Sequence, residues 1–163
     1  MSEAHRIHCY EYVNRPYEEV SEALVLGAVG IFQRATSSAA VRATSLVSKL
    51  KVTVAGLEVG KNVVVRVLRV DRHAKVGQTM SEATRLELEW HAETGRALFP
   101  SMHAALTAYP LSPSDTQLDL EGEYDPPLGI LGDVADRLLG HRIAQASVHQ
   151  FLEDVAGRLA AEK

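Results

Sequence analysis

Cysteine is nearly absent from this chain, because Cys9 is the only one among 163 residues. A single cysteine excludes an internal disulfide bond and a cysteine-based zinc site, and it suits a reducing cytoplasm. Long apolar runs are also missing, since a charged residue interrupts each of them, and we expect no membrane insertion. The polar segment 1–6 lacks the apolar stretch of a signal peptide. We therefore expect a cytoplasmic protein.

The common motifs of catalysis and nucleotide binding are missing as well. The sequence has no Gly-x-Ser-x-Gly nucleophile elbow, no Gly-x-Gly-x-x-Gly fingerprint and no Walker loop. His91 and His103 could lie roughly opposite each other on neighbouring strands, but they supply only two ligands, whereas a zinc site needs three or four. We therefore predict no catalytic residues, no metal and no cofactor.

The composition is that of one ordinary soluble domain spanning residues 1–163. Apolar residues make up 46% of the chain and the formal net charge is -4, which argues against a dedicated nucleic-acid binder. Region 42–75 differs, because it holds eight Lys or Arg residues and two acidic ones. Such a basic region could bind RNA, an acidic protein or anionic lipid. It could equally be a solvated sheet edge, which the lack of interleaved aromatic residues favours.

Alternation of apolar and polar residues predicts an antiparallel sheet of about six strands. The clearest segment is 85–93, in which Leu86, Leu88 and Trp90 share one face and charged residues share the other. Similar β-forming segments occupy residues 7–13, 50–54, 63–70, 102–108 and 117–124. The turns between consecutive strands are too short for parallel pairing, which requires a long crossover.

Helical spacing of apolar residues occurs in two regions. The first follows Pro16, and Gly27 and Gly30 predict that it divides into two short helices, with residues 34–45 as a connection. The second runs from about residue 128 to residue 161 and predicts one long helix. The expected fold class is therefore α+β, with a curved antiparallel sheet around the long C-terminal helix and an apolar pocket between them.

The expected inner face of the sheet supplies the candidate ligand site. Trp90, Met102 and Tyr124 are its strongest members, because they are large and adaptable and the tyrosine offers a hydroxyl group. The same residues could instead be ordinary core. The complete predicted set of cavity residues is Arg69, Leu88, Trp90, Met102, Leu106, Leu120, Tyr124 and Leu138.

Arg69 is the one charged member of that set. If alternation continues from Val63, Arg69 falls on the dry face, where it could bind a ligand carboxylate or phosphate. A β-bulge or the end of the strand would instead turn the side chain toward water.

Two short motifs resemble the SRPBCC superfamily, which includes START domains, polyketide cyclases and birch-pollen-allergen proteins. The segment Pro16-Tyr17-Glu18-Glu19-Val20 looks like the Pro-x-Glu-x-Val start of the first helix in that group. Leu118-x-Leu-x-Gly-x-Tyr124, with Pro126-Pro127-Leu128-Gly129 after it, resembles uncharacterised bacterial members. The resemblance covers nearly the whole chain in element order. It implies a helix-grip fold that binds lipids, sterols, polyketides or other hydrophobic molecules.

Three functions remain open at this point. The absence of a catalytic set favours a binding or carrier protein for a hydrophobic small molecule. An enzyme similar to the polyketide aromatase/cyclases would use Tyr124 or Arg69 to steer proton transfer. An interaction module would use region 42–75. Apolar Val64, Leu68 and Val70 on the expected outer face hint at a homodimer contact, or they lie under a loop.

Overall fold

The computed structural model describes residues 5–49, 63–76, 81–92, 101–125 and 134–161, and the side chains of most of them. The elements in chain order are β1 (His5–Val13), α1 (Tyr17–Lys49), β2 (Val63–Val76), β3 (Ser81–Ala92), β4 (Ser101–Ser112), β5 (Asp115–Asp125) and α2 (Val134–Ala161). The strands form one antiparallel sheet in the order β1-β5-β4-β3-β2. Strands β2 to β5 each lie beside the next strand in the chain, and β1 is the edge strand beside β5.

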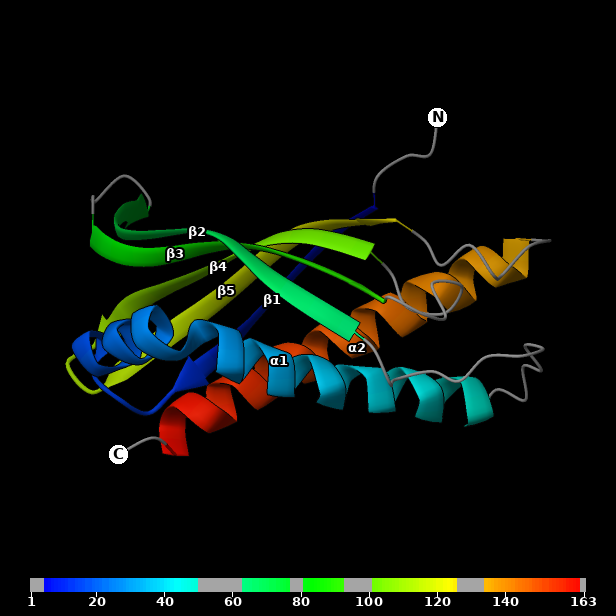
Figure 1. The fold of residues 1–163 in the computed structure, drawn as a ribbon, viewed down its shortest axis with the longest axis horizontal. Helices are drawn as coiled ribbons and strands as arrows, with labels where there is room; N and C mark the ends of the chain where they lie inside the picture. Colours follow the sequence, from blue (N-terminus) through cyan, green and yellow to red (C-terminus); the bar gives the residue numbers. More distant parts are fainter. Residues whose placement is uncertain (1–4, 50–62, 77–80, 93–100, 126–133, 162–163) are drawn as a thin grey trace.

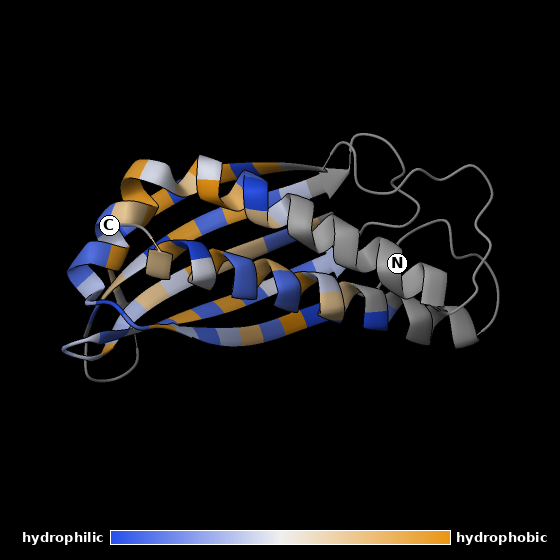
Figure 2. Cartoon of the chain, turned by 90° about the horizontal axis from the view of Figure 1, so that it is seen from below, coloured by the Kyte–Doolittle hydropathy of each residue, from blue (hydrophilic) through white to orange (hydrophobic). Residues whose placement is uncertain are grey.

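Both helices lie on the same face of this sheet (Figure 1). α1 packs beside β2, whereas α2 packs beside β1, and the two helices also contact each other. Seen from the helix side, the strands show alternating hydrophobic and hydrophilic positions beneath the helices (Figure 2). This alternation buries one face of the sheet, which we call the inner face, and leaves the outer face to solvent. The predicted α+β class and helix-grip arrangement are confirmed, with α1 sharing the cover that was expected from α2 alone.

The segment after β1 is one helix of 33 residues and not two short ones. Glycine at 27 and 30 lowers helix stability by about 1 kcal/mol each relative to alanine, but no proline follows to stop the helix. Buried Leu24, Ile31 and Phe32 on both sides of the glycines keep the helix against the core. Packing therefore overrides the local preference, and the expected connection at 34–45 lies within α1.

The described residues form five strands, where about six were predicted. The missing segment, 50–54, lies outside the described residues. The other five predicted strands all occur, and β2 continues to Val76, beyond its predicted end.

A bulge in β2 changes which way its side chains point. Val67 pairs with Leu88 and Arg69 pairs with Glu87, so that Leu68 is an extra residue on β2. One extra residue shifts the alternation of faces by one position. Arg69 is consequently exposed on the outer face, and the prediction that it lies on the dry face is wrong.

The junction between β1 and α1 contacts the C-terminal part of α2. Glu18 and Glu19 lie in the first turn of α1, where carboxylates interact favourably with the helix dipole. Arg15 forms an ion pair with Glu19 at 2.8 Å and donates a hydrogen bond to the backbone oxygen of Leu159 at 2.7 Å. Arg15 therefore satisfies a carbonyl group near the C-terminal end of α2, across 144 positions of sequence.

Candidate ligand-binding site

Three of the predicted site residues lie side by side on the inner face. Trp90 pairs with Met102, and Met102 pairs with Tyr124. The row extends to Val65 on β2 and His5 on β1, so that it crosses all five strands. We call these five residues the Trp90 row. It lies near the end of the sheet where β5 ends.

The Trp90 row contacts α2 through two aromatic partners that the sequence analysis missed. The ring of Phe151 packs edge-on against Trp90, with 4.7 Å between the ring centroids. His141 accepts or donates a hydrogen bond with the Tyr124 hydroxyl at 2.5 Å, through its Nδ1 atom. His141 continues the stripe of buried α2 positions that includes Ala144 and Val148, and this helical spacing was the signal that could have identified it.

Tyr124 combines a buried ring with a polar contact. Its side chain is 2% exposed, and burial raises the pKa of its hydroxyl above the ordinary value of 10. The ring stacks against His5 at 5.4 Å between centroids. A neutral tyrosine hydroxyl held against an imidazole can donate a hydrogen bond to a polar ligand atom or pass a proton to it.

The remaining predicted residues are divided among different places. Leu88 lies one row further along the inner face, between Ala104 and Val67. Leu106 and Leu120 are paired with each other, further from the Trp90 row. All three leucines are buried. Leu138 belongs to α2, but its side chain lies outside the described part of the chain.

An open groove separates the sheet from α2 along the free edge of β1. Its volume is about 440 Å³, which is within the usual range for small-molecule sites. Its lining includes the apolar residues Ile7, Cys9 and Val148 and the cationic residues Arg6 and Arg142. The remaining lining residues are His8, Gln145, Ala146 and His149. We call this the edge groove.

The edge groove is connected to the inner face by strand pairing. Ile7 pairs with Gly122, Gly122 pairs with Ala104, and Ala104 pairs with Leu88. This row lies directly beside the Trp90 row. An apolar molecule seated in the edge groove would therefore contact the margin of the same face that the predicted site residues occupy.

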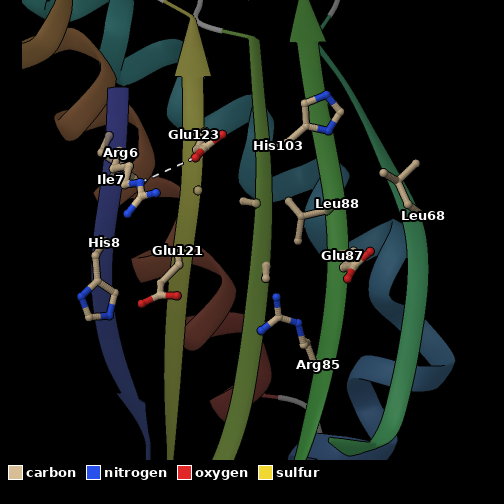
Figure 3. A pocket seen from close by; sticks show the side chains of 13 residues that line it. Arg6, Ile7, His8, Leu68, Arg85, Glu87, Leu88, His103, Glu121 and Glu123 are labelled. Atoms are coloured by element: carbon tan, nitrogen blue, oxygen red, sulfur yellow. Dashed lines mark ion pairs between the residues drawn. The ribbon is translucent and has the colours of Figure 1, made fainter. Parts of the chain in front are cut away.

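A second depression, of about 540 Å³, lies on the outer face of the sheet (Figure 3). Both helices lie behind the sheet in this view, and the charged side chains that are labelled belong to the outer face, whereas Ile7 and Leu88 are buried on the inner face. Charges of both signs line the depression, and Arg6 forms an ion pair with Glu123 at 3.6 Å across it. Such a charged, open surface is well suited to solvent and does not match an apolar ligand.

Among the described residues, one cluster brings three potential metal ligands together. Glu11 on β1 and His149 and Glu153 on α2 each place one ligand atom within 4.8 Å of the others. His103, by contrast, faces Glu89 across the β3–β4 pair at 3.7 Å and not His91, as the sequence had suggested. The side chain of His91 lies outside the described part of the chain.

Comparison with known proteins identifies the fold. The chain is similar to the Zhui aromatase/cyclase from Streptomyces sp. R1128, with a TM-score of 0.50 and 14% identity over 96% of this chain and 94% of that one. The chain has the helix-grip fold. A conserved protein from Geobacillus kaustophilus matches with a TM-score of 0.47 and 12% identity, over 96% of this chain and 95% of that one. A START superfamily protein from Mycobacterium smegmatis matches with a TM-score of 0.43 and 10% identity, over 95% of this chain and 97% of that one.

The helix-grip fold that the two sequence motifs implied is thus confirmed. No family model matches the helix-grip chain, and no curated protein matches it either. Within the described elements, no helix is both long enough and apolar enough to cross a membrane.

Proposed function

We propose that this helix-grip chain binds an apolar small molecule that carries an acidic group, in the space between the sheet and α2. The observation that carries the proposal is the edge groove, because it is an open groove of about 440 Å³ whose lining combines apolar side chains with cationic ones. An alkyl chain would contact Ile7 and Val148. A carboxylate or phosphate would bind Arg142, because Arg6 is already paired with Glu123 on the outer face.

The predicted residues of the Trp90 row would hold the end of a longer ligand. Trp90, Met102 and Tyr124 are adjacent but almost fully buried, so a ligand would reach them only by displacing the α2 side chains that cover them. The adjacent row connects them to the edge groove. Lipid-, sterol- and polyketide-like molecules all have the required apolar body. The aromatase/cyclase shares the fold, and fold-level similarity is compatible with such a ligand but does not specify it.

The direct test is binding of oleate, measured by isothermal titration calorimetry and native mass spectrometry. We expect oleate to bind more tightly than oleyl alcohol, and Arg142→Gln to weaken oleate binding about tenfold while leaving the alcohol unchanged. Ala146→Phe should block binding, because the new ring would fill the edge groove. Ala160→Phe is the matched control, since Ala160 is exposed elsewhere on the same helix.

Intrinsic fluorescence would locate the ligand, because Trp90 is the only tryptophan of the chain. A shift in Trp90 emission on oleate binding would support contact with the Trp90 row. Binding with unchanged emission would restrict the ligand to the edge groove. Failure of oleate, cholesterol and a planar polyphenol to bind at all would contradict the proposal.

A second candidate function is an enzyme similar to the aromatase/cyclases, and the contact between Tyr124 and His141 favours it. A hydroxyl–imidazole pair at the margin of an apolar surface can transfer a proton to or from a ligand carbonyl. Tyr124→Phe keeps the ring and removes the hydroxyl. If this variant binds a poly-β-ketone analogue normally but no longer converts it to an aromatic product, the enzyme hypothesis gains support.

A further inference from the structure

One polar cluster of the described residues is unexplained by ligand binding or by packing. Glu11 lies on β1 between Cys9 and Val13, at alternate positions that point to the inner face. Its side chain is only 28% exposed, and the nearest ring nitrogen of His149 is 3.8 Å from its carboxylate. This separation is too long for a hydrogen bond. A half-buried carboxylate is therefore held beside α2 without a close partner among the described groups.

α2 presents two further donors at the same place. His149 and Glu153 are four residues apart, which puts them on the same side of a helix. The Nδ1 atom of His149 lies 3.8 Å from a carboxylate oxygen of Glu153, and the Nε2 atom faces Glu11. The two carboxylates thus approach different ring nitrogens of His149, and one ligand atom of each of the three residues lies within 4.8 Å of the others.

The distances between these imidazole and carboxylate atoms suit a divalent cation held between them better than hydrogen bonds from one side chain to another. Zinc binds imidazole nitrogen and carboxylate oxygen at about 2.0–2.2 Å, so tetrahedral ligand atoms lie roughly 3.3–3.5 Å from one another. The ligand atoms of the cluster all lie within 4.8 Å of one another. Small rotations of exposed side chains would close the remaining gap, and His149 would use one of its two ring nitrogens.

We propose that Glu11, His149 and Glu153 form a Zn²⁺ site that joins β1 to α2, with at least one coordination position left to water or to a ligand anion. Two carboxylates balance the charge of the ion. The guanidinium group of Arg142 is seven residues before His149, about 10 Å along the helix axis, which limits its repulsion. The site lies beside the edge groove, because His149 lines that groove as well.

The test is calorimetric titration of the full chain with Zn²⁺ alone at pH 7.5, followed by Co²⁺ absorption spectroscopy to report the ligand geometry. We expect one ion per chain. Each of Glu11→Gln, His149→Ala and Glu153→Gln should weaken binding at least about tenfold.

The matched control is His103→Ala. His103 faces Glu89 at 3.7 Å on the outer face, a histidine–carboxylate pair that lacks a third ligand in the described structure. This variant should leave Zn²⁺ affinity unchanged. Absence of Zn²⁺ binding, or equal affinity in wild type and Glu153→Gln, would overturn the proposal and leave the cluster as simple ion pairs. Oleate binding is measured separately, so either proposal can fail without the other.

Discussion

Among Gly27, Gly30, Gly122 and Gly157, Gly122 is the glycine whose replacement its neighbours restrict most. A Cβ atom at this position would lie 2.8 Å from the backbone oxygen of His103 and 2.9 Å from the Cβ of Ala104. The sulfur atom of Met102 would be 3.2 Å away. The side chain of Met102 therefore covers the space that the glycine leaves open, and the inner face is closely packed beside the Trp90 row.

Gly122→Ala should consequently destabilise the fold, although alanine normally favours ordered structure more than glycine does. The backbone oxygen cannot move without disturbing the β4–β5 pairing, and overpacking of this kind typically costs about 1–3 kcal/mol. Urea denaturation would measure the change in the free energy of unfolding. Gly30→Ala is the control, since nothing lies within 4 Å of its added Cβ, and it should be neutral or stabilising. Equal effects at both positions would show that the contact at Gly122 is relieved at little cost.

At the scale of elements, α1 is joined to β3 by a buried group of hydroxyls. Thr84 is fully buried, and its Oγ1 atom lies 2.9 Å from the Tyr17 hydroxyl and 2.5 Å from the Ser21 hydroxyl. Both partners belong to the first turns of α1. Because buried hydroxyls need partners, this group fixes the position where α1 meets the sheet.

Replacing Thr84 with valine should loosen that junction. The substitution keeps the shape of the side chain but leaves the Ser21 hydroxyl without its Thr84 partner, and we expect a loss of about 1–3 kcal/mol in the free energy of unfolding. Thr107→Val, on the partly exposed outer face of β4, is the matched control and should change stability by less than about 0.5 kcal/mol. Hydrogen exchange of α1 amides would check the local effect. Unaltered exchange in Thr84→Val would argue against this role.

For the molecule as a whole, three ionisable groups link stability to alkaline pH. Burial raises the pKa of the Cys9 thiol from 9.0 to about 12, and the charges of Glu11 and Asp119 add to this shift. Burial also raises the pKa of Tyr109 from 10.0 to about 12, with a further contribution from the adjacent Asp119 carboxylate. The pKa of Tyr124 is raised by burial as well.

Each of these groups is neutral when protonated, and folding favours that form. In the unfolded chain the groups lose protons at their ordinary pKa values, so the stabilising contribution is complete below about pH 9 and declines as the pH approaches 12. We expect the urea midpoint to fall steadily between those limits, and the fall to be smaller in Cys9→Ala. A constant midpoint across this range would contradict the assignment.

The amino-acid sequence alone determined the faces of β3, β4 and β5. Alternation in 85–93 placed Leu86, Leu88 and Trp90 on the buried side, because side-chain direction along a strand is a local property with a period of two residues. It also predicted the antiparallel sheet and the long final helix. The two motifs then implied the correct fold.

Only the tertiary structure decided how these elements meet. The bulge at Leu68 turned the side chain of Arg69 to the outer face. Core contacts kept α1 continuous through two glycines. The edge of β1 came to lie beside α2. The contacts of Tyr124 with His141 and of Glu11 with His149 follow from that arrangement. Strand register and helix position depend on packing free energies summed over residues far apart in the chain, and no local pattern records that sum.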